Sequence, residues 1–191
     1  MVLERQARIG ARPLEMRDLP DPVPGPEEIL VRVAACGVCR TDLHVIEGDL
    51  APHRLPLVPG HQIVGRVTAR GARASRFAPG DRVGIAWLRR TCGSCAYCRS
   101  GRENLCCGSR YTGWDDDGGY AEYAVVDEAF AYAIPERFSD VEAAPLLCAG
   151  IIGYRALRRS RVEPGQKRRL RGFGAPPHLR AQPALHPAGP G

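Results

Sequence analysis

The chain has 191 residues, of which 44% are hydrophobic and 25% charged, and its formal net charge at pH 7 is +6. This length suits one ordinary domain, or one domain with a fragment of a second. Its first sixteen residues are charged throughout, unlike a secretory signal, and its longest apolar run, residues 143–153, is shorter than the roughly 20 residues that span a bilayer. These features argue against an exported or membrane-inserted protein, and we expect a cytoplasmic one.

The positive charge is concentrated at the end of the chain. Residues 155–191 contain nine basic residues and one acidic residue, whereas residues 1–154 contain 18 basic and 20 acidic residues. A basic tail can bind polyanions. Because the remainder of the chain is slightly acidic, we do not expect nucleic acid to be a partner.

Short strand patterns alternate with turns rich in glycine and proline over most of the chain. Such a pattern predicts a mainly β fold with short helices, built around a small, rolled-up, barrel-like sheet. The expected elements are strands at residues 29–36, 63–69, 82–87, 120–126 and 131–135, and a short helix at residues 39–47.

From Ser139 the pattern becomes helical. Ser139 can cap a helix, and Glu142 stands three residues later, as in a capping box. Pro145 lies within the following helical run, where it removes a backbone donor and is expected to kink or interrupt the helix.

Four cysteines between residues 92 and 106 give the strongest chemical signal. Two-residue gaps separate Cys92, Cys95 and Cys98, and seven residues separate Cys98 from Cys106. Such gaps let neighbouring thiolates bind one ion, and a closed set of four cysteines is typical of structural Zn²⁺. A disulfide-stapled loop is the alternative, but nothing in the sequence indicates an oxidising compartment.

Three widely separated residues, Cys39, His61 and Cys148, are candidates for a second metal site. Two thiolates and one imidazole leave a fourth position open, as a catalytic zinc requires. Buried free cysteines are the alternative, because spacing alone does not bring these residues together.

Six stretches of the chain resemble the zinc-dependent medium-chain alcohol dehydrogenases, in family order over roughly residues 25–157. The resemblance implies a GroES-like catalytic domain, a following Rossmann domain that binds NAD(P), and assembly as a homo-oligomer. We therefore expect the catalytic domain at residues 1–154, with a zinc lobe at 89–112, and a partial start of the α/β Rossmann domain at 155–191. The matching stretches are GVCRTDLH, PGHQIVGRV, FAPGDRVGI, CGSCAYCRSGRENLC, GGYAEYAVV and APLLCAGIIGYRAL.

The resemblance implies two Zn²⁺ ions per chain and hydride transfer between NAD(P) and a small alcohol, aldehyde or ketone. The catalytic zinc would be held by Cys39, His61 and Cys148, and the structural zinc by Cys92, Cys95, Cys98 and Cys106. Cys36 and Cys107 match no ligand position of the family.

Further roles follow from the same resemblance. Asp42 would orient His61, Thr41 and His44 would form a proton relay, and Arg40 would lie near the cofactor pyrophosphate. Gln62 stands directly after the zinc histidine, where many members of the family have glutamate. We expect this change to alter the electrostatics of the zinc site.

The family pattern breaks down towards the end of the chain. Residues 171–177 lie where the first Rossmann turn is expected, and Gly172 and Gly174 are the remaining candidates for cofactor-binding glycines, but Pro177 takes the third glycine position. Residues 172–191 contain four glycines and five prolines, a composition typical of disorder.

We therefore expect a truncated or frameshifted gene product with impaired activity. The alternative is a non-enzymatic zinc-binding fragment with a basic tail. A zinc-free quinone reductase relative, a third interpretation, is disfavoured by the seven candidate ligands.

Overall fold

The computed structural model describes residues 1–161, together with residues 166 and 174. Most of the expected Rossmann remnant, Gly172 included, therefore lies outside the described residues. Within the described part of the chain, no helix is both long and apolar enough to cross a membrane. The division into domains at residue 154 remains a prediction.

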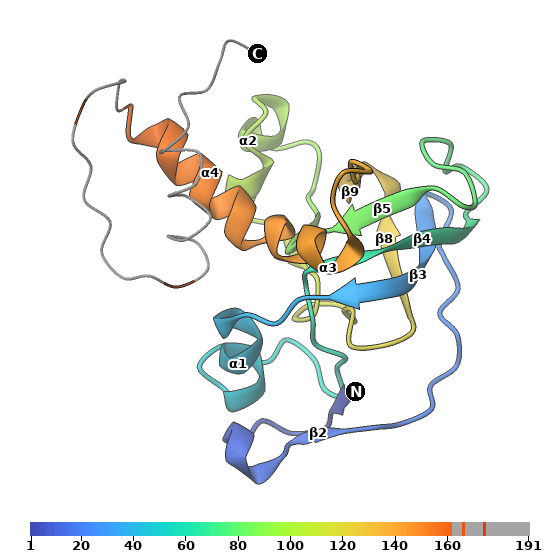
Figure 1. Ribbon diagram of the computed structural model, residues 1–191, viewed down its shortest axis with the longest axis vertical. Coiled ribbons are helices and arrows are strands. Elements are labelled where there is room, and N and C mark those ends of the chain that lie inside the picture. The colour runs from blue at the N-terminus through green and yellow to red at the C-terminus, as the bar shows by residue number, and fades with distance from the viewer. Residues whose placement is uncertain (162–165, 167–173, 175–191) are drawn as a thin grey trace.

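A five-stranded antiparallel sheet forms the centre of the fold, and its strands curve around one core (Figure 1). The strand order is β8-β3-β4-β5-β9. The mainly β fold with short helices is thus confirmed. The strands are β3 (Glu28–Cys36), β4 (Ile63–Arg70), β5 (Arg82–Ile85), β8 (Tyr123–Asp127) and β9 (Ala131–Ala133).

Smaller elements surround this sheet. Strands β1 (Val2–Leu3) and β2 (Leu14–Glu15) form one two-stranded sheet, and β6 (Leu88–Arg90) and β7 (Arg110–Tyr111) form another. The helices are α1 (Arg40–Glu47), α2 (Ala96–Arg99), α3 (Asp140–Ala143) and α4 (Ala149–Arg159). Short 3-10 turns lie at Ile9–Ala11, Glu103–Leu105, Glu128–Phe130 and Ala144–Leu147.

Apolar side chains pack on both faces of the central sheet, although Arg66 and Thr68 of β4 are exposed. Ile29 and Ile63 belong to the main core on one side, whereas Val64, the next residue of β4, packs with Ala143 and Leu147 on the other side. This alternation follows from the two-residue period of a strand. The second packing cluster holds the α3–α4 segment against the sheet and so fixes the start of α4.

The helical segment after Ser139 has the predicted interruption. Ser139 and Glu142 form a capping box, and α3 ends at Ala143. Pro145 lies in the 3-10 turn that follows, after which α4 begins at Ala149. The proline therefore divides the run into two helices and leaves Cys148 at their junction.

The strand expected at residues 82–87 is shorter than predicted, since β5 ends at Ile85. Thr112 explains the difference. Its hydroxyl donates to the carbonyl of Ala86, and its backbone N–H donates to the carbonyl of Trp87. Because both carbonyls accept from Thr112 and not from a strand of the central sheet, the chain leaves that sheet before Trp87.

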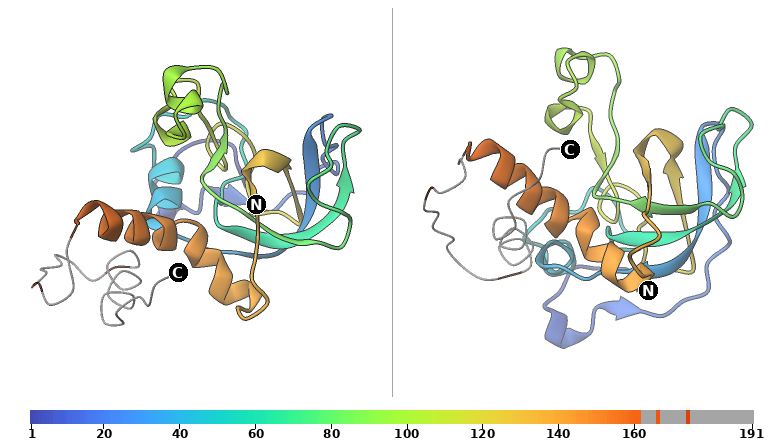
Figure 2. Two further views of the ribbon diagram at one scale, coloured as in Figure 1. Left: turned by 90° about the horizontal axis from the view of Figure 1, so that it is seen from above. Right: turned by 45° about the horizontal axis from the view of Figure 1, so that its top comes forward.

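Two segments project from the body of the molecule. The loop that contains α2 extends above the sheet, and α4 extends to one side of it (Figure 2). Within residues 91–109, which form this loop, Cys106 alone is buried. The loop therefore has almost no apolar core of its own.

Candidate metal centres

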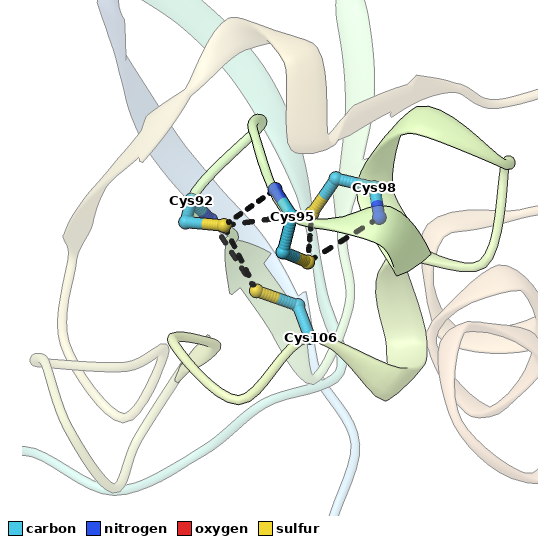
Figure 3. A group of neighbouring side chains, drawn as sticks. All are labelled: Cys92, Cys95, Cys98 and Cys106. Carbon is cyan, nitrogen blue, oxygen red and sulfur yellow. Dashed lines mark hydrogen bonds between the residues drawn. The ribbon is translucent and has the colours of Figure 1, made fainter.

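The four cysteines of the α2 loop point towards one another (Figure 3). The Sγ atoms of Cys95 and Cys98 are 3.5 Å apart, those of Cys92 and Cys106 are also 3.5 Å apart, and those of Cys92 and Cys98 are 3.9 Å apart. Tetrahedral zinc with Zn–S bonds of about 2.3 Å needs sulfurs about 3.8 Å apart. The four thiols therefore fit one Zn²⁺ ion.

Backbone N–H groups also favour thiolates in this loop. The N–H of Cys95 donates to Cys92 Sγ at 3.3 Å, and the N–H of Cys98 donates to Cys95 Sγ at 3.5 Å, where Cys95 caps α2. Hydrogen bonds from the backbone around Ser94 and Cys95 lower the pKa of the Cys92 thiol to about 6. A lowered thiol pKa favours the thiolate form that binds metal.

A second cluster brings together Cys39, His61 and Cys148, whose possible ligand atoms lie within 4.8 Å of one another. Cys39 Sγ lies 3.3 Å from His61 Nε2. The three residues come from the start of α1, the loop before β4 and the junction before α4. The fold thus assembles three donor atoms that the sequence separates widely.

Cys39 is held by the first turn of α1. It is the N-cap residue of this helix, and its Sγ accepts from the N–H of Thr41 at 3.3 Å. Asp42 completes the capping box, since its Oδ2 accepts from the N–H of Cys39 at 2.8 Å. A carboxylate in the first turn is favourable because it faces the positive end of the helix dipole.

His61 is oriented by Asp42. Its Nδ1 lies 2.9 Å from Asp42 Oδ1, and the two residues are only 1% and 2% exposed. Because Nδ1 is used in this contact, Nε2 is the nitrogen that faces Cys39. A carboxylate on the far nitrogen is the usual partner of a metal-binding histidine.

Cys148 lies before α4 but does not cap it. No side-chain capping hydrogen bond is formed at this N-cap, so the thiol is not used by the helix. Leu147, which directly precedes it in the 3-10 turn, belongs to the second packing cluster and so ties Cys148 to the sheet.

The three groups strongly perturb one another. The hydrogen bond from Cys148 lowers the pKa of Cys39 to about 3, whereas the same contact and burial raise the pKa of Cys148 well above its usual range. Burial opposes the charged form of His61, but the hydrogen bonds to Asp42 and Cys39 raise its pKa to about 9. A metal ion bound by the three groups would therefore have to displace the protons of His61 and Cys148.

The other predicted site residues lie on or beside α1. Thr41 is partly buried next to Cys39, and Arg40 is exposed at the first position of the helix. His44 is paired through Nδ1 with Asp49 Oδ2 at 2.7 Å. Gln62 is 2% exposed beside Gly37, so its side chain is buried next to His61.

The remaining predicted residues are not part of these clusters. Cys36 ends β3 against the main core, and burial raises the pKa of its thiol to about 12. Cys107 is exposed beside the four-cysteine loop. Gly174 is exposed, and among the described residues none lies within 4 Å of the position a Cβ would take there.

A cavity of about 860 Å³ lies elsewhere, between residues 16–22 and residues 116–125. None of the seven candidate ligands, all of which are described, lines it. The candidate centres therefore rest on the geometry of their donor atoms and not on this cavity.

A family model described as "Alcohol dehydrogenase GroES-like domain" matches residues 25–136. The chain belongs to this family. It is 57% identical over 188 residues to the Mycobacterium tuberculosis protein named "Probable alcohol dehydrogenase AdhA", and the match covers 96% of this chain and 54% of that protein. Because so much of this chain is covered, the similarity extends beyond residue 161.

Solved alcohol dehydrogenases have the same fold. The cobalt- and zinc-bound thermostable alcohol dehydrogenase from Pyrobaculum aerophilum matches with a TM-score of 0.85 at 28% identity, over 96% of this chain and 55% of that one. The CAD from Helicobacter pylori complexed with NADP(H) matches with a TM-score of 0.79 at 30% identity, over 84% of this chain and 49% of that one. The chain thus spans about half the length of the relatives it matches, and the predicted zinc-dependent alcohol dehydrogenase family is confirmed.

An aromatic wall beside the three-ligand centre was not predicted. Trp87 meets His61 edge to face, with ring centroids 4.9 Å apart, and stacks on Tyr111 at 5.0 Å and Trp114 at 5.9 Å. Trp87 lies only two residues after β5, within the strand expected at 82–87. Its departure from that strand depends on Thr112, which no local pattern relates to it.

Proposed function

We propose that this chain supplies the zinc-binding catalytic part of an NAD(P)-dependent alcohol dehydrogenase that acts on a small alcohol and the matching aldehyde or ketone. The observation that supports this proposal best is the convergence of Cys39, His61 and Cys148 from three separate segments. In the same chain, four cysteines form a closed set. One open and one closed set are the donor arrangements of a catalytic and a structural zinc.

The donor chemistry fits two zinc ions per chain. Cys39, His61 and Cys148 would hold the first and leave one side for substrate, and the four cysteines of the α2 loop would hold the second. A zinc ion bound in the open set would act as a Lewis acid on an alcohol oxygen and favour its deprotonation near neutral pH. The residues around the set orient the ligands and move the proton.

Asp42 keeps His61 in one orientation through the contact at 2.9 Å. Thr41 lies two residues after Cys39 and donates its N–H to Cys39 Sγ at 3.3 Å, so its hydroxyl is the proposed first acceptor of the substrate proton. His44, one turn further along α1, would carry that proton towards solvent, because its side chain is 38% exposed. The contact from Asp49 to His44 Nδ1 leaves Nε2 to exchange the proton.

The aromatic wall would form one side of the substrate site. Trp87 presents its ring to His61, while Tyr111 and Trp114 support that ring. Such a surface favours the apolar part of an alcohol and excludes water from the reacting atoms.

Cofactor binding and assembly are proposed from the family. NADP(H) is bound by the Helicobacter pylori relative, and we assign NAD(P) as the hydride carrier here. Arg40 is the proposed contact to the pyrophosphate, and Gly172 and Gly174 are proposed to belong to the cofactor-binding turn. We also propose a homo-oligomer. A cytoplasmic location remains a prediction.

Metal analysis combined with turnover tests this proposal. The purified chain should hold two zinc ions, and Cys39→Ala or His61→Ala should each hold one. Reduction of NAD(P)⁺ with an alcohol, followed by the absorbance of the reduced cofactor, should depend on both residues. Two zinc ions in the Cys39→Ala protein, or turnover that survives either change, would show that the three-ligand set is not the catalytic centre.

A further inference from the structure

The hydroxyl of Tyr120 is buried and has no hydrogen-bond partner. Among the described residues it is the one fully buried side-chain nitrogen or oxygen atom in this state. Buried polar groups are nearly always paired, because an unpaired group has lost its water without replacement. This hydroxyl therefore calls for a structural or functional reason.

The backbone places Tyr120 beside the three-ligand centre. Its N–H donates to the carbonyl of Pro59 at 3.0 Å, and the N–H of Gly119 donates to the carbonyl of Gly60 at 2.9 Å. The segment ending at Tyr120 is thus tied to the segment that leads into His61.

The ring of Tyr120 lies close to Gly60. Gly60 has a φ of +99°, and a Cβ at this position would lie 2.6 Å from Cδ1 of Tyr120. The ring therefore packs directly on the residue before His61. Cys36 Sγ, at the end of β3, would lie 2.9 Å from the same Cβ position, so the surroundings of Gly60 are filled from both segments.

Asp42 is the charged group that acts most strongly on this hydroxyl. Burial raises the pKa of Tyr120, and the carboxylate of Asp42 raises it further. Oδ1 of Asp42 contacts His61 and Oδ2 accepts from Cys39 N–H. A carboxylate offers about four acceptor sites, so Asp42 retains the capacity for another donor.

We propose that Tyr120 is a positioning residue of the three-ligand centre, whose hydroxyl donates a hydrogen bond to the Asp42 carboxylate when that centre holds its metal ion. The inference rests on the proposed zinc site. A short approach of the phenol to the carboxylate would pair the one orphaned hydroxyl and add a second restraint to the group that orients His61. Tyr120 itself touches neither metal nor substrate.

Zinc affinity tests the inference without any need for turnover. Competition with a chromophoric chelator at pH 7.5 should give the affinities of the four-cysteine and three-ligand sites of the 191-residue chain separately. Tyr120→Phe keeps the ring and removes the hydroxyl, and we expect it to weaken the three-ligand site about 3- to 10-fold, below the 10- to 100-fold typical of a direct partner of a metal ligand. The four-cysteine site should keep its affinity.

Two further variants serve as controls for the effect of Tyr120→Phe. Tyr132→Phe removes a phenol from β9 and should leave both affinities unchanged. In an Asp42→Ala background, Tyr120→Phe should have no further effect, because alanine has no side-chain oxygen to accept the bond. An affinity within twofold of the unchanged chain, or an equal loss in the Asp42→Ala background, would overturn the positioning role.

Failure of the zinc site itself is distinguishable. If the unchanged chain binds only one zinc ion, the proposed function is overturned, and this inference with it. If Tyr120→Phe does not fold, the unchanged chain labelled with ¹³Cζ-tyrosine answers the question by NMR. The Tyr120 signal should shift when the three-ligand site is filled, and an unmoved signal would overturn the inference.

Discussion

Nδ1 of His61 lies 2.9 Å from Oδ1 of Asp42, and both side chains are almost completely buried. The same carboxylate accepts from the N–H of Cys39 through its other oxygen. One residue of α1 therefore fixes two candidate ligands from different segments, and it does so through both of its oxygens. The position of Asp42 links the capping of a helix to the geometry of a metal site.

Replacing Asp42 with asparagine should weaken zinc binding at the three-ligand site about 10- to 100-fold, because a neutral amide orients and polarises the imidazole less than a carboxylate. Chelator competition measures this change. Asp49→Asn, which alters a carboxylate just beyond the end of α1 that contacts His44, is the matched control and should leave the affinity unchanged. Equal affinities in the Asp42→Asn and unchanged proteins would contradict the role of Asp42.

Zinc affinity of the three-ligand site should rise with pH from 6 to about 9 and should rise less steeply above that, where only Cys148 still carries a proton to be displaced. In the metal-free chain His61 has a pKa of about 9, and the pKa of Cys148 is raised, so both carry protons below that pH. Cys39, with a pKa of about 3, has already lost its proton. Zinc must displace the two remaining protons, so binding should release about two protons per ion near neutral pH.

Titration calorimetry in buffers of different ionisation enthalpy measures this proton release. The Cys39→Ala chain is the control, since it keeps the four-cysteine site alone. Proton uptake, or an affinity at the three-ligand site that does not change between pH 6 and pH 9, would contradict the expected linkage.

Loss of zinc from the α2 loop should unfold that loop and leave the sheet intact. Cys95→Ser removes one of four ligands from a segment in which only Cys106 is buried, so little else holds it folded. Hydrogen exchange should increase within residues 91–109 and remain slow in β3 and β4. Cys107→Ser, which alters an exposed neighbour outside the ligand set, should change neither zinc content nor exchange.

Gly60→Ala should destabilise the chain by about 2–4 kcal/mol, since a methyl group there adds overpacking to an unfavourable backbone conformation. Gly80 is the matched control. Its φ of +97° is almost the same as the +99° of Gly60, but nothing lies within 4 Å of its Cβ position. Gly80→Ala should therefore lower the free energy of unfolding by only about 1 kcal/mol, because it adds the unfavourable backbone conformation without any overpacking. Equal midpoints in urea for the two variants would contradict the close packing of Tyr120 on Gly60.

Local chemistry made much of the fold predictable. The alternation in residues 29–36 and 63–69 gave strands within a residue of β3 and β4, because a half-buried strand shows its two-residue period directly. Ser139, Glu142 and Pro145 marked the helix start and interruption, since caps and prolines act on their own neighbours. The end of β5 was missed because it is set by Thr112, 26 residues away from Ala86.

The two candidate metal centres also differ in how far the sequence alone could predict them. Cys92, Cys95, Cys98 and Cys106 form a local loop, so their spacing alone determined that they could share one ion. Cys39, His61 and Cys148 depend on α1, the loop before β4 and the start of α4, and tertiary structure decided that their donor atoms meet. The positions of Trp87 beside His61 and of Tyr120 on Gly60 were likewise decided by packing, because contacts between distant segments have no periodic signature in the sequence.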